Sequence, residues 1–361
     1  MNNPYYTAPT PSEEPEASRQ NSPYPSEIRQ DFSKIGVAYL AMTVGFMAVA
    51  YLVQILALVF YPSLLDAWWF GWVVSILPLY AVGLPILWLL LRRVPVSPHN
   101  SHCIVKGLAT EKTSFGWKLW LILLVMAFGC MTAGGIAGNI IMGVLSEIMQ
   151  YDYAFALNSM VIDTPIWFTF ICTCVCAPLG EELLFRKLLI DRTRRYGDLA
   201  SILLSGLLFG LFHGNLFQFF YAALVGMVLA YVYTRSGRYL PCVALHAAIN
   251  FMGSVVNPAI SKLVTPYLSG EALDEQAIAE LLTDKGFLLA LPAYLFLVLW
   301  QYGMLIAGLT LFCTHLSRRQ ISRGSVPLEG ETVSAPLANP GMIACVAVML
   351  LLVVVNLIPA G

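Results

Sequence analysis

Long apolar runs alternate with short polar segments along almost the whole chain from residue 36 onward. Because an α-helix needs about 20 apolar residues to cross a bilayer, these runs predict membrane spans. About nine runs qualify: 36–61, 68–91, 119–146, 165–190, 199–213, 216–234, 240–257, 287–314 and 341–359. The short fifth run either continues past Gly214 or ends in a break there. The pattern predicts an all-α fold, a polytopic transmembrane helical bundle.

The first 35 residues contain no such run and are rich in Pro, Ser, Glu, Asn and Tyr. A segment of this composition buries too little apolar surface to order itself, so we predict a disordered cytosolic tail over 1–35. Ionisable and amide side chains inside the apolar runs are concentrated in the middle of the chain. We therefore divide the rest into N-terminal transmembrane helices (36–162), a core of four motif-bearing helices (163–257), and a C-terminal loop with further helices (258–361).

Composition supports a membrane protein, with 58% hydrophobic residues, 11% charged residues and a mean hydropathy of +0.73. Soluble domains carry roughly 25% charged residues. The bilayer is thus the expected main partner, and nucleic acid is not, because basic residues form no stripe with interleaved aromatic residues. Most of the eight Cys residues lie inside apolar runs, where Cys behaves as a small apolar residue, so we predict no disulfide framework.

Loop charges predict the orientation of the spans. Acidic residues dominate the loops that follow odd-numbered runs, and only Lys262 and Lys285 break this pattern. Basic residues instead follow even-numbered runs: Arg92, Arg93, Lys106, Lys112 and Lys118; Lys187, Arg192, Arg194 and Arg195; Arg235 and Arg238; Arg318, Arg319 and Arg323. Since basic loops remain on the cytosolic side, we expect the amino terminus inside and the carboxyl terminus outside, in the plasma membrane.

Small residues recur every four positions on the fifth and sixth runs. Such faces let helix backbones approach closely in lipid, so these two helices are expected to pack tightly. The residues are Gly206, Gly210 and Gly214 on the fifth run, and Ala222, Gly226 and Ala230 on the sixth.

Ionisable and amide side chains inside the spans gather on three helices. A charge at the bilayer centre costs at least ~2.5–3.5 kcal/mol, so such residues usually have a function. A rise of about 1.5 Å per residue places four of them in one layer nearer the basic loops. The residues are Glu181, Glu182 and Arg186 on the fourth run, His213 four positions after Phe209 on the fifth, and His246 and Asn250 on the seventh.

Spacing suggests a role for each carboxylate. Glu182 and Arg186 are four residues apart, the favoured order for a helical ion pair, so both are expected to be supporting residues. Glu181 points about 100° away and has no local cation, which suits a general base. Pro178 is expected to kink the helix beside it. Glu181 and His213 would then deprotonate a water.

The shared depth of these polar residues suggests where the oxyanion formed during peptide hydrolysis would bind. His246 and Asn250 lie one turn apart on one helix face and could donate hydrogen bonds to it. Phe209 would support the site by packing.

In these motifs the chain resembles the CAAX protease and bacteriocin-processing enzyme (CPBP) family, which includes the type II CAAX prenyl proteases. The shared pattern is Glu-Glu-x-x-x-Arg, then Phe-x-x-x-His, then His-x-x-x-Asn, over roughly residues 163–257. The resemblance implies an intramembrane glutamic endopeptidase with catalytic residues Glu181, His213, His246 and Asn250. It implies supporting roles for Glu182 and Arg186. A peptide or a membrane-anchored protein is the implied substrate, and a prenylated one is only one option.

The sequence leaves three alternatives open. One Glu with two His is a permissible zinc set, although no His-Glu-x-x-His helix is present; we predict no metal and no cofactor. Buried Glu and His residues also serve proton-coupled transporters, but these usually show related halves, which this chain lacks. The third alternative is a non-catalytic scaffold or immunity protein that retains the motifs.

Overall fold

A computed structural model describes residues 25–97, 116–151, 164–267, 281–315, 321, 323–326 and 328–358. All regular secondary structure in these residues is helical, and none of them forms a strand. Residues 1–24 of the predicted tail lie outside the described residues, as do Lys106, Lys112, Arg318 and Arg319 of the basic loops.

Seven helical segments are long and apolar enough to span a membrane. They are α2 (Pro25–Phe60); α3, η2 and α4 (Phe70–Pro78, Leu79–Gly83, Leu84–Leu91); α6 (Trp117–Met149); the fourth span, Ile166–Tyr196; α12 (Leu216–Ser236); α13 with η6, α14 and η7 (Tyr239–Asn250, Phe251–Val256, Asn257–Val264, Thr265–Tyr267); and α16 (Lys285–His315). The chain is therefore an all-α integral membrane protein, as the apolar runs predict.

The two remaining predicted spans form shorter apolar helices. They are α11 (Asp198–Phe212) and α17 (Pro340–Val355), of 15 and 16 residues. At 1.5 Å per residue such helices reach roughly 23 Å, less than the ~30 Å of a hydrocarbon core. Asn356 after α17 donates to the carbonyl of Gly214 after α11 (2.7 Å), so the two short helices end beside each other.

The predicted tail is shorter than its composition suggested, because α2 begins at Pro25 and residues 25–35 are helical. Ile28, Phe32 and Ile35 recur at helical spacing and are buried. The Phe32 ring lies 5.0 Å from the ring of Tyr196, measured between centroids. Apolar residues at helical spacing thus override the polar composition around them, and the helix extends beyond the span itself.

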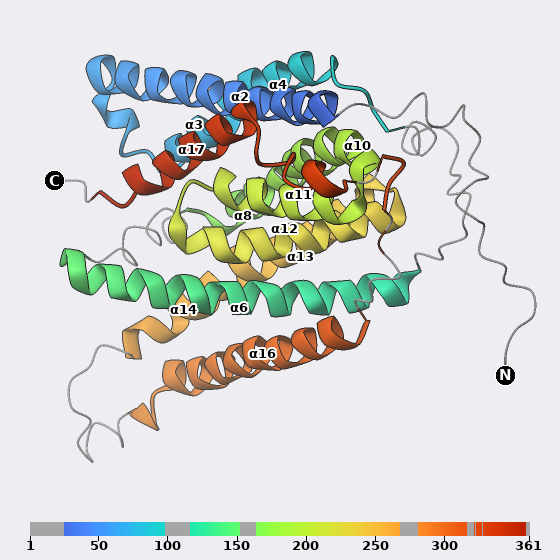
Figure 1. The fold of residues 1–361 in the computed structure, drawn as a ribbon. Helices are drawn as coiled ribbons and strands as arrows, with labels where there is room; N and C mark the ends of the chain where they lie inside the picture. The colour runs from blue at the N-terminus through green and yellow to red at the C-terminus, as the bar shows by residue number, and fades with distance from the viewer. Residues whose placement is uncertain are drawn as a thin grey trace, which may run out of the picture.

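The helices are arranged in layers, with the motif-bearing helices in the middle (Figure 1). Helices α2 and α17 pack against each other on one side, and α6 and α16 pack against each other on the opposite side. Helix α12 contacts both α6 and α11, which ties the outer pair to the middle layer. The layer that carries the polar residues is thus covered on both sides by the flanking helices.

The small residues of α11 and α12 meet as predicted. A Cβ built on Gly210 would lie 2.8 Å from the carbonyl oxygen of Phe219, and one on Gly226 would lie 3.1 Å from the Cα of Gly206. Gly214 differs from the others, because its φ of +67° places it in the left-handed turn after α11. The sequence therefore identified the packing face correctly, except that its third glycine ends the helix.

A similar close contact between α6 and α12 leads to a prediction. A Cβ on Gly134 would lie 2.3 Å from the Cα of Tyr221, so Gly134→Val must push the two helices apart. We expect a loss of about 1–3 kcal/mol in unfolding free energy, measured by thermal or denaturant unfolding in detergent. Gly135 is the matched control, since a Cβ there meets nothing within 4 Å; equal losses for Gly135→Val and Gly134→Val would contradict the packing argument.

Candidate active site

The fourth span, which carries both glutamates, is not a regular α-helix. It runs through α8 (Ile166–Thr169), η3 (Phe170–Cys176), α9 (Ala177–Glu182), η4 (Leu183–Leu188) and α10 (Leu189–Thr193), with η3 and η4 in π-helical geometry. Pro178 stands at the start of α9, where its missing N–H coincides with the change of hydrogen-bond register. Single π-turns of this kind are frequent at functional sites. The helix irregularity predicted at Pro178 is thus a pair of π segments around one short α segment.

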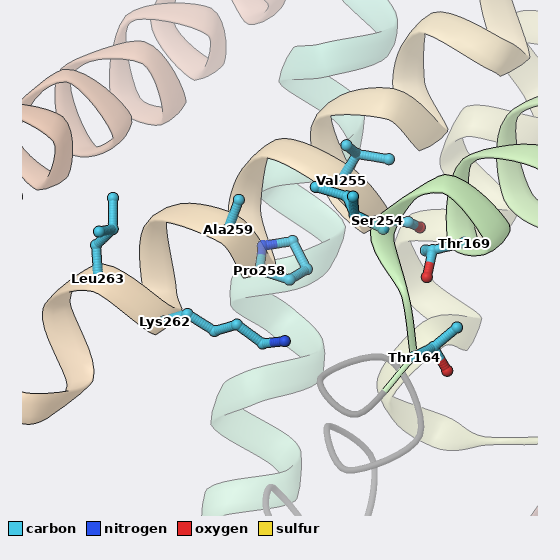
Figure 2. A pocket seen from close by; sticks show the side chains of 9 residues that line it. Thr164, Thr169, Ser254, Val255, Pro258, Ala259, Lys262 and Leu263 are labelled. Carbon is cyan, nitrogen blue, oxygen red and sulfur yellow. The ribbon is translucent and has the colours of Figure 1, made fainter. Parts of the chain in front are cut away.

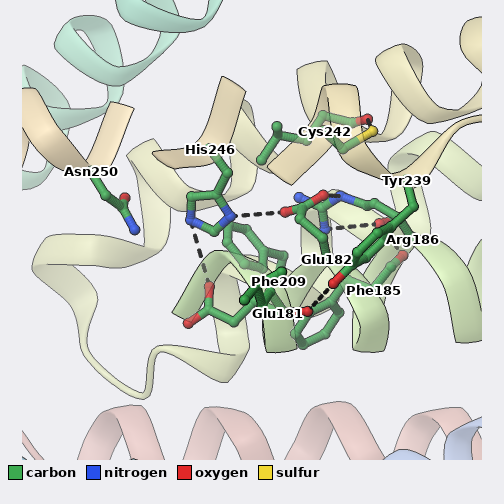
Figure 3. A network of polar contacts seen from close by, with 12 residues as sticks. Glu181, Glu182, Phe185, Arg186, Phe209, Tyr239, Cys242, His246 and Asn250 are labelled. Atoms are coloured by element: carbon green, nitrogen blue, oxygen red, sulfur yellow. Dashed lines mark hydrogen bonds and ion pairs between the residues drawn. The ribbon is translucent and has the colours of Figure 1, made fainter. Parts of the chain in front are cut away.

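Glu182 is the buried centre of the polar network (Figure 3). One carboxylate oxygen lies 3.0 Å from Arg186 Nε, and the other lies 2.9 Å from His246 Nδ1. The side chains of Glu182 and Arg186 have no exposed surface. The Arg186 N–H is not aligned for a hydrogen bond to the carboxylate, so this contact is mainly Coulombic. The ion pair expected from the four-residue spacing is present.

Arg186 also has a neighbour that its helix does not supply. Its guanidinium carbon lies 4.7 Å from the centroid of the Phe209 ring, within range of a cation–π interaction. Phe209 is almost fully buried and comes from α11. The aromatic ring therefore contributes to holding the charged pair.

Glu181 faces the same imidazole from its other side. Its carboxylate lies 3.7 Å from His246 Nε2, and its side chain is 15% exposed where that of Glu182 is fully buried. Because a carboxylate only accepts, Nδ1–H of His246 donates to Glu182, and Nε2 is left toward Glu181. The 3.7 Å separation is too long for a direct hydrogen bond. One imidazole thus lies between two carboxylates of different accessibility.

His213 lies at the end of α11, next to Phe209. Its Nδ1 is 2.8 Å from the carbonyl oxygen of Phe209, and the two rings are 4.9 Å apart between centroids. A carbonyl accepts, so Nδ1 carries the proton and Nε2 is an acceptor. The Phe209 ring also lies 5.6 Å from that of His246. Phe209 is therefore the link between the two histidines.

Asn250 joins α13 to the fourth span. Its side-chain nitrogen donates to the carbonyl of Thr173 in η3 at 2.7 Å. One amide N–H remains after this bond, one helical turn beyond His246. Figure 3 shows the Glu181 carboxylate on the side of His246 where Asn250 lies.

The structure thus gathers the residues singled out from the sequence in two ways. Glu181, Glu182, Arg186 and His246 form one contacting network, while His213 and Asn250 are tied to it through Phe209 and Thr173. The contact between Glu182 and His246 was not predicted, because it joins residues 64 positions apart and depends on how two helices pack.

Comparison with protein families identifies the part of the chain that carries this network. Residues 163–252 match the family model of type II CAAX prenyl endopeptidase Rce1-like proteins. The match confirms the resemblance seen in the motifs, over about a quarter of the chain, and ends five residues before the predicted core does. A protease family in an integral membrane protein indicates intramembrane proteolysis in general. No curated protein and no solved structure gives a match.

Two side chains that the sequence did not single out contact the glutamate-bearing turn. The Tyr80 hydroxyl donates to the carbonyl of Cys176 at 2.8 Å, and the Tyr239 hydroxyl donates to the carbonyl of Leu179. Tyr80 belongs to η2 and lies outside the family segment. A tyrosine within an apolar run can face lipid or several neighbouring helices, so the sequence spacing of Tyr80 and Tyr239 does not indicate these contacts.

A cavity of about 320 Å³ lies at the other end of the fourth span (Figure 2). Thr164 and Thr169 line it from α8 and the residues before it, and Ser254, Pro258 and Lys262 line it from η6 and α14. η3 and η6 lead away from the glutamates toward this end, so none of the residues that line this cavity belongs to the network around Glu181 and His246.

The geometry of the candidate ligands bears on metal binding. Among the described residues, no three His, Cys, Asp or Glu side chains converge as a metal site requires. His246 Nδ1 is engaged by Glu182, and His213 Nδ1 by the Phe209 carbonyl. Either histidine could therefore offer only Nε2 as a ligand.

Proposed function

We propose that the chain is an intramembrane endopeptidase of glutamic type, in which Glu181 activates a water molecule. One observation carries the proposal: Glu181 and Glu182 face the two nitrogens of the same imidazole, yet only Glu181 has solvent-accessible surface. Glu182 is committed to Arg186 and cannot exchange protons freely with a substrate. The accessible carboxylate, Glu181, is therefore suited to act as the base, and the buried one, Glu182, to orient the His246 imidazole.

In the proposed reaction, Glu181 accepts a proton from water while the water oxygen bonds to the scissile carbonyl carbon. His213 would assist through Nε2, which can accept a hydrogen bond from the same water because Nδ1–H is tied to Phe209. The carbonyl oxygen becomes an oxyanion. The C–N bond then breaks, and the amine leaves with the proton that Glu181 held.

The oxyanion would bind to His246 and Asn250. With Nδ1–H held by Glu182, His246 can donate from Nε2 only as the imidazolium, whose charge the Glu182 carboxylate balances. Asn250 retains one amide N–H beside it. Both donors would stabilise the negative charge that develops on the carbonyl oxygen in the transition state.

The substrate is expected to be a peptide or a membrane-anchored protein that reaches the site within the bilayer. The matched family's description names prenyl endopeptidases, so a prenylated cysteine near the scissile bond is one substrate to test. The basic loops would place the glutamates nearer the cytosolic face of the plasma membrane, with the amino terminus inside and the carboxyl terminus outside.

The test is cleavage of prenylated and unprenylated membrane-anchored peptides by the purified full chain in liposomes, read by mass spectrometry. Wild type should cleave within the membrane-proximal segment, and Glu181→Gln should cleave there about 10³-fold more slowly. His246→Gln should lower kcat about 10²–10³-fold, as loss of one oxyanion donor does. A chelator should leave the rate unchanged.

Other outcomes would overturn specific parts of the proposal. Chelator inhibition reversed by added zinc would replace the glutamic mechanism with a metal-dependent one. Ion flux into liposomes that disappears in Glu181→Gln, without cleavage of any peptide, would favour a transporter. Absence of both activities in a folded chain would favour a scaffold.

A further inference from the structure

Two backbone carbonyls shortly before the glutamates bond to side chains, that of Cys176 at the end of η3 and that of Leu179 in α9. Tyr80 donates to the carbonyl of Cys176 at 2.8 Å, and Tyr239 donates to that of Leu179. Between two π segments the backbone changes hydrogen-bond register twice, so carbonyls there can gain partners outside the helix. The two hydroxyls therefore act on the backbone of the turn that leads directly into Glu181.

Tyr80 contacts this turn through more than its hydroxyl. A Cβ on Gly180 would lie 1.9 Å from the Tyr80 ring, so only glycine lets the ring lie this close to the backbone. Gly180 is the residue directly before Glu181. Any shift of this ring would move the backbone next to Glu181.

Tyr239 contacts the same turn from a different helix, α13. It is the first residue of α13, which also carries His246 and Asn250 two and three turns later. Its bond to Leu179 therefore sets α13 against α9, as Figure 3 shows for Tyr239, His246 and Glu181. The position of His246 relative to Glu181 depends on that alignment.

We propose that Tyr80 and Tyr239 are positioning residues that hold the 176–180 turn and thereby aim Glu181 at the reacting water. This inference rests on the proposed function. It assigns part of the site to η2, a segment that the family match does not include. Reacting groups must stay within a fraction of an ångström of the productive geometry, so the loss of one such contact should reduce turnover rather than substrate binding.

The experiment compares Tyr80→Phe and Tyr239→Phe with Tyr39→Phe in the liposome cleavage assay. Tyr39 is the matched control, because its hydroxyl also donates to the fourth span, at the carbonyl of Leu184 (2.6 Å), beyond both glutamates. We expect kcat to fall about 10-fold or more in Tyr80→Phe and Tyr239→Phe, with KM unchanged, and to stay near wild type in Tyr39→Phe. All three variants should fold, since each retains its ring.

A second measurement separates positioning from general destabilisation. In the Glu181→Gln background, Tyr80→Phe should add no further loss, since a residue that acts through Glu181 has nothing left to aim. Wild-type kcat in both Tyr80→Phe and Tyr239→Phe, or an equal fall in Tyr39→Phe, would overturn the inference. If Glu181→Gln itself cleaves normally, the proposed function fails first, which is a distinct result.

Discussion

Glu181→Gln is expected to lower kcat for peptide cleavage about 10³-fold, the usual contribution of a general base. The amide is nearly isosteric with the carboxylate but cannot accept a proton from water. The closest polar contact of Glu181 is 3.7 Å from His246, so little folding energy depends on it, and thermal unfolding should match wild type. Single-turnover kinetics with saturating protein in liposomes measure the chemical step directly.

Glu147→Gln is the matched control for this substitution. Glu147 is an exposed carboxylate near the end of α6, so the same chemical change there should leave kcat unaltered. Retained cleavage in Glu181→Gln at the wild-type rate would exclude Glu181 as the base. Equal loss in Glu147→Gln would mean that the assay responds to expression or insertion rather than to chemistry.

Arg186→Met is expected to destabilise the chain by about 3–5 kcal/mol, because it leaves a buried charge without its partner. The Glu182 side chain has no exposed surface, and Arg186 is its cationic neighbour at 3.0 Å. Methionine fills much of the same volume against Phe209, so lost packing contributes little. The loss is measured as the shift in unfolding midpoint in detergent.

A double variant distinguishes charge from volume in this prediction. Replacing both partners, as in Glu182→Leu with Arg186→Met, should recover most of the lost stability, since apolar pairs often replace buried ion pairs without loss. The same double variant should remain poorly active, because His246 Nδ1 would have no acceptor to fix its tautomer. Full stability of the single variant Arg186→Met would show that Glu182 is neutralised in another way.

The sequence was informative about the site wherever residues of one helix act together. The four-residue spacing of Glu182 and Arg186 predicts their ion pair, and the one-turn spacing of His246 and Asn250 predicts a shared face. It could not predict that Glu182 binds His246, or that a carbonyl in η3 binds Asn250. These contacts depend on the rotation of one helix against another, and the apolar surfaces of these helices allow many rotations.

The fold was predictable for a different reason. In a bilayer no water is available to bond backbone polar groups, so long apolar runs form helices, in which most of these groups bond within the segment. The sequence predicted the membrane helices and the packing of Gly206 against Gly226. It also predicted the resemblance of the motif-bearing helices to the protease family. Local spacing and hydropathy are sufficient for these features.

The tertiary structure alone decided three features. It turned residues 25–35 into a helix that packs on Tyr196, divided the fourth span into α and π segments, and brought Tyr80 onto Gly180. The first and the third depend on a contact between residues that lie far apart in the chain, where the partner supplies the favourable free energy. The sequence contains the residues of such a contact, but only the packing of the helices determines which of them meet.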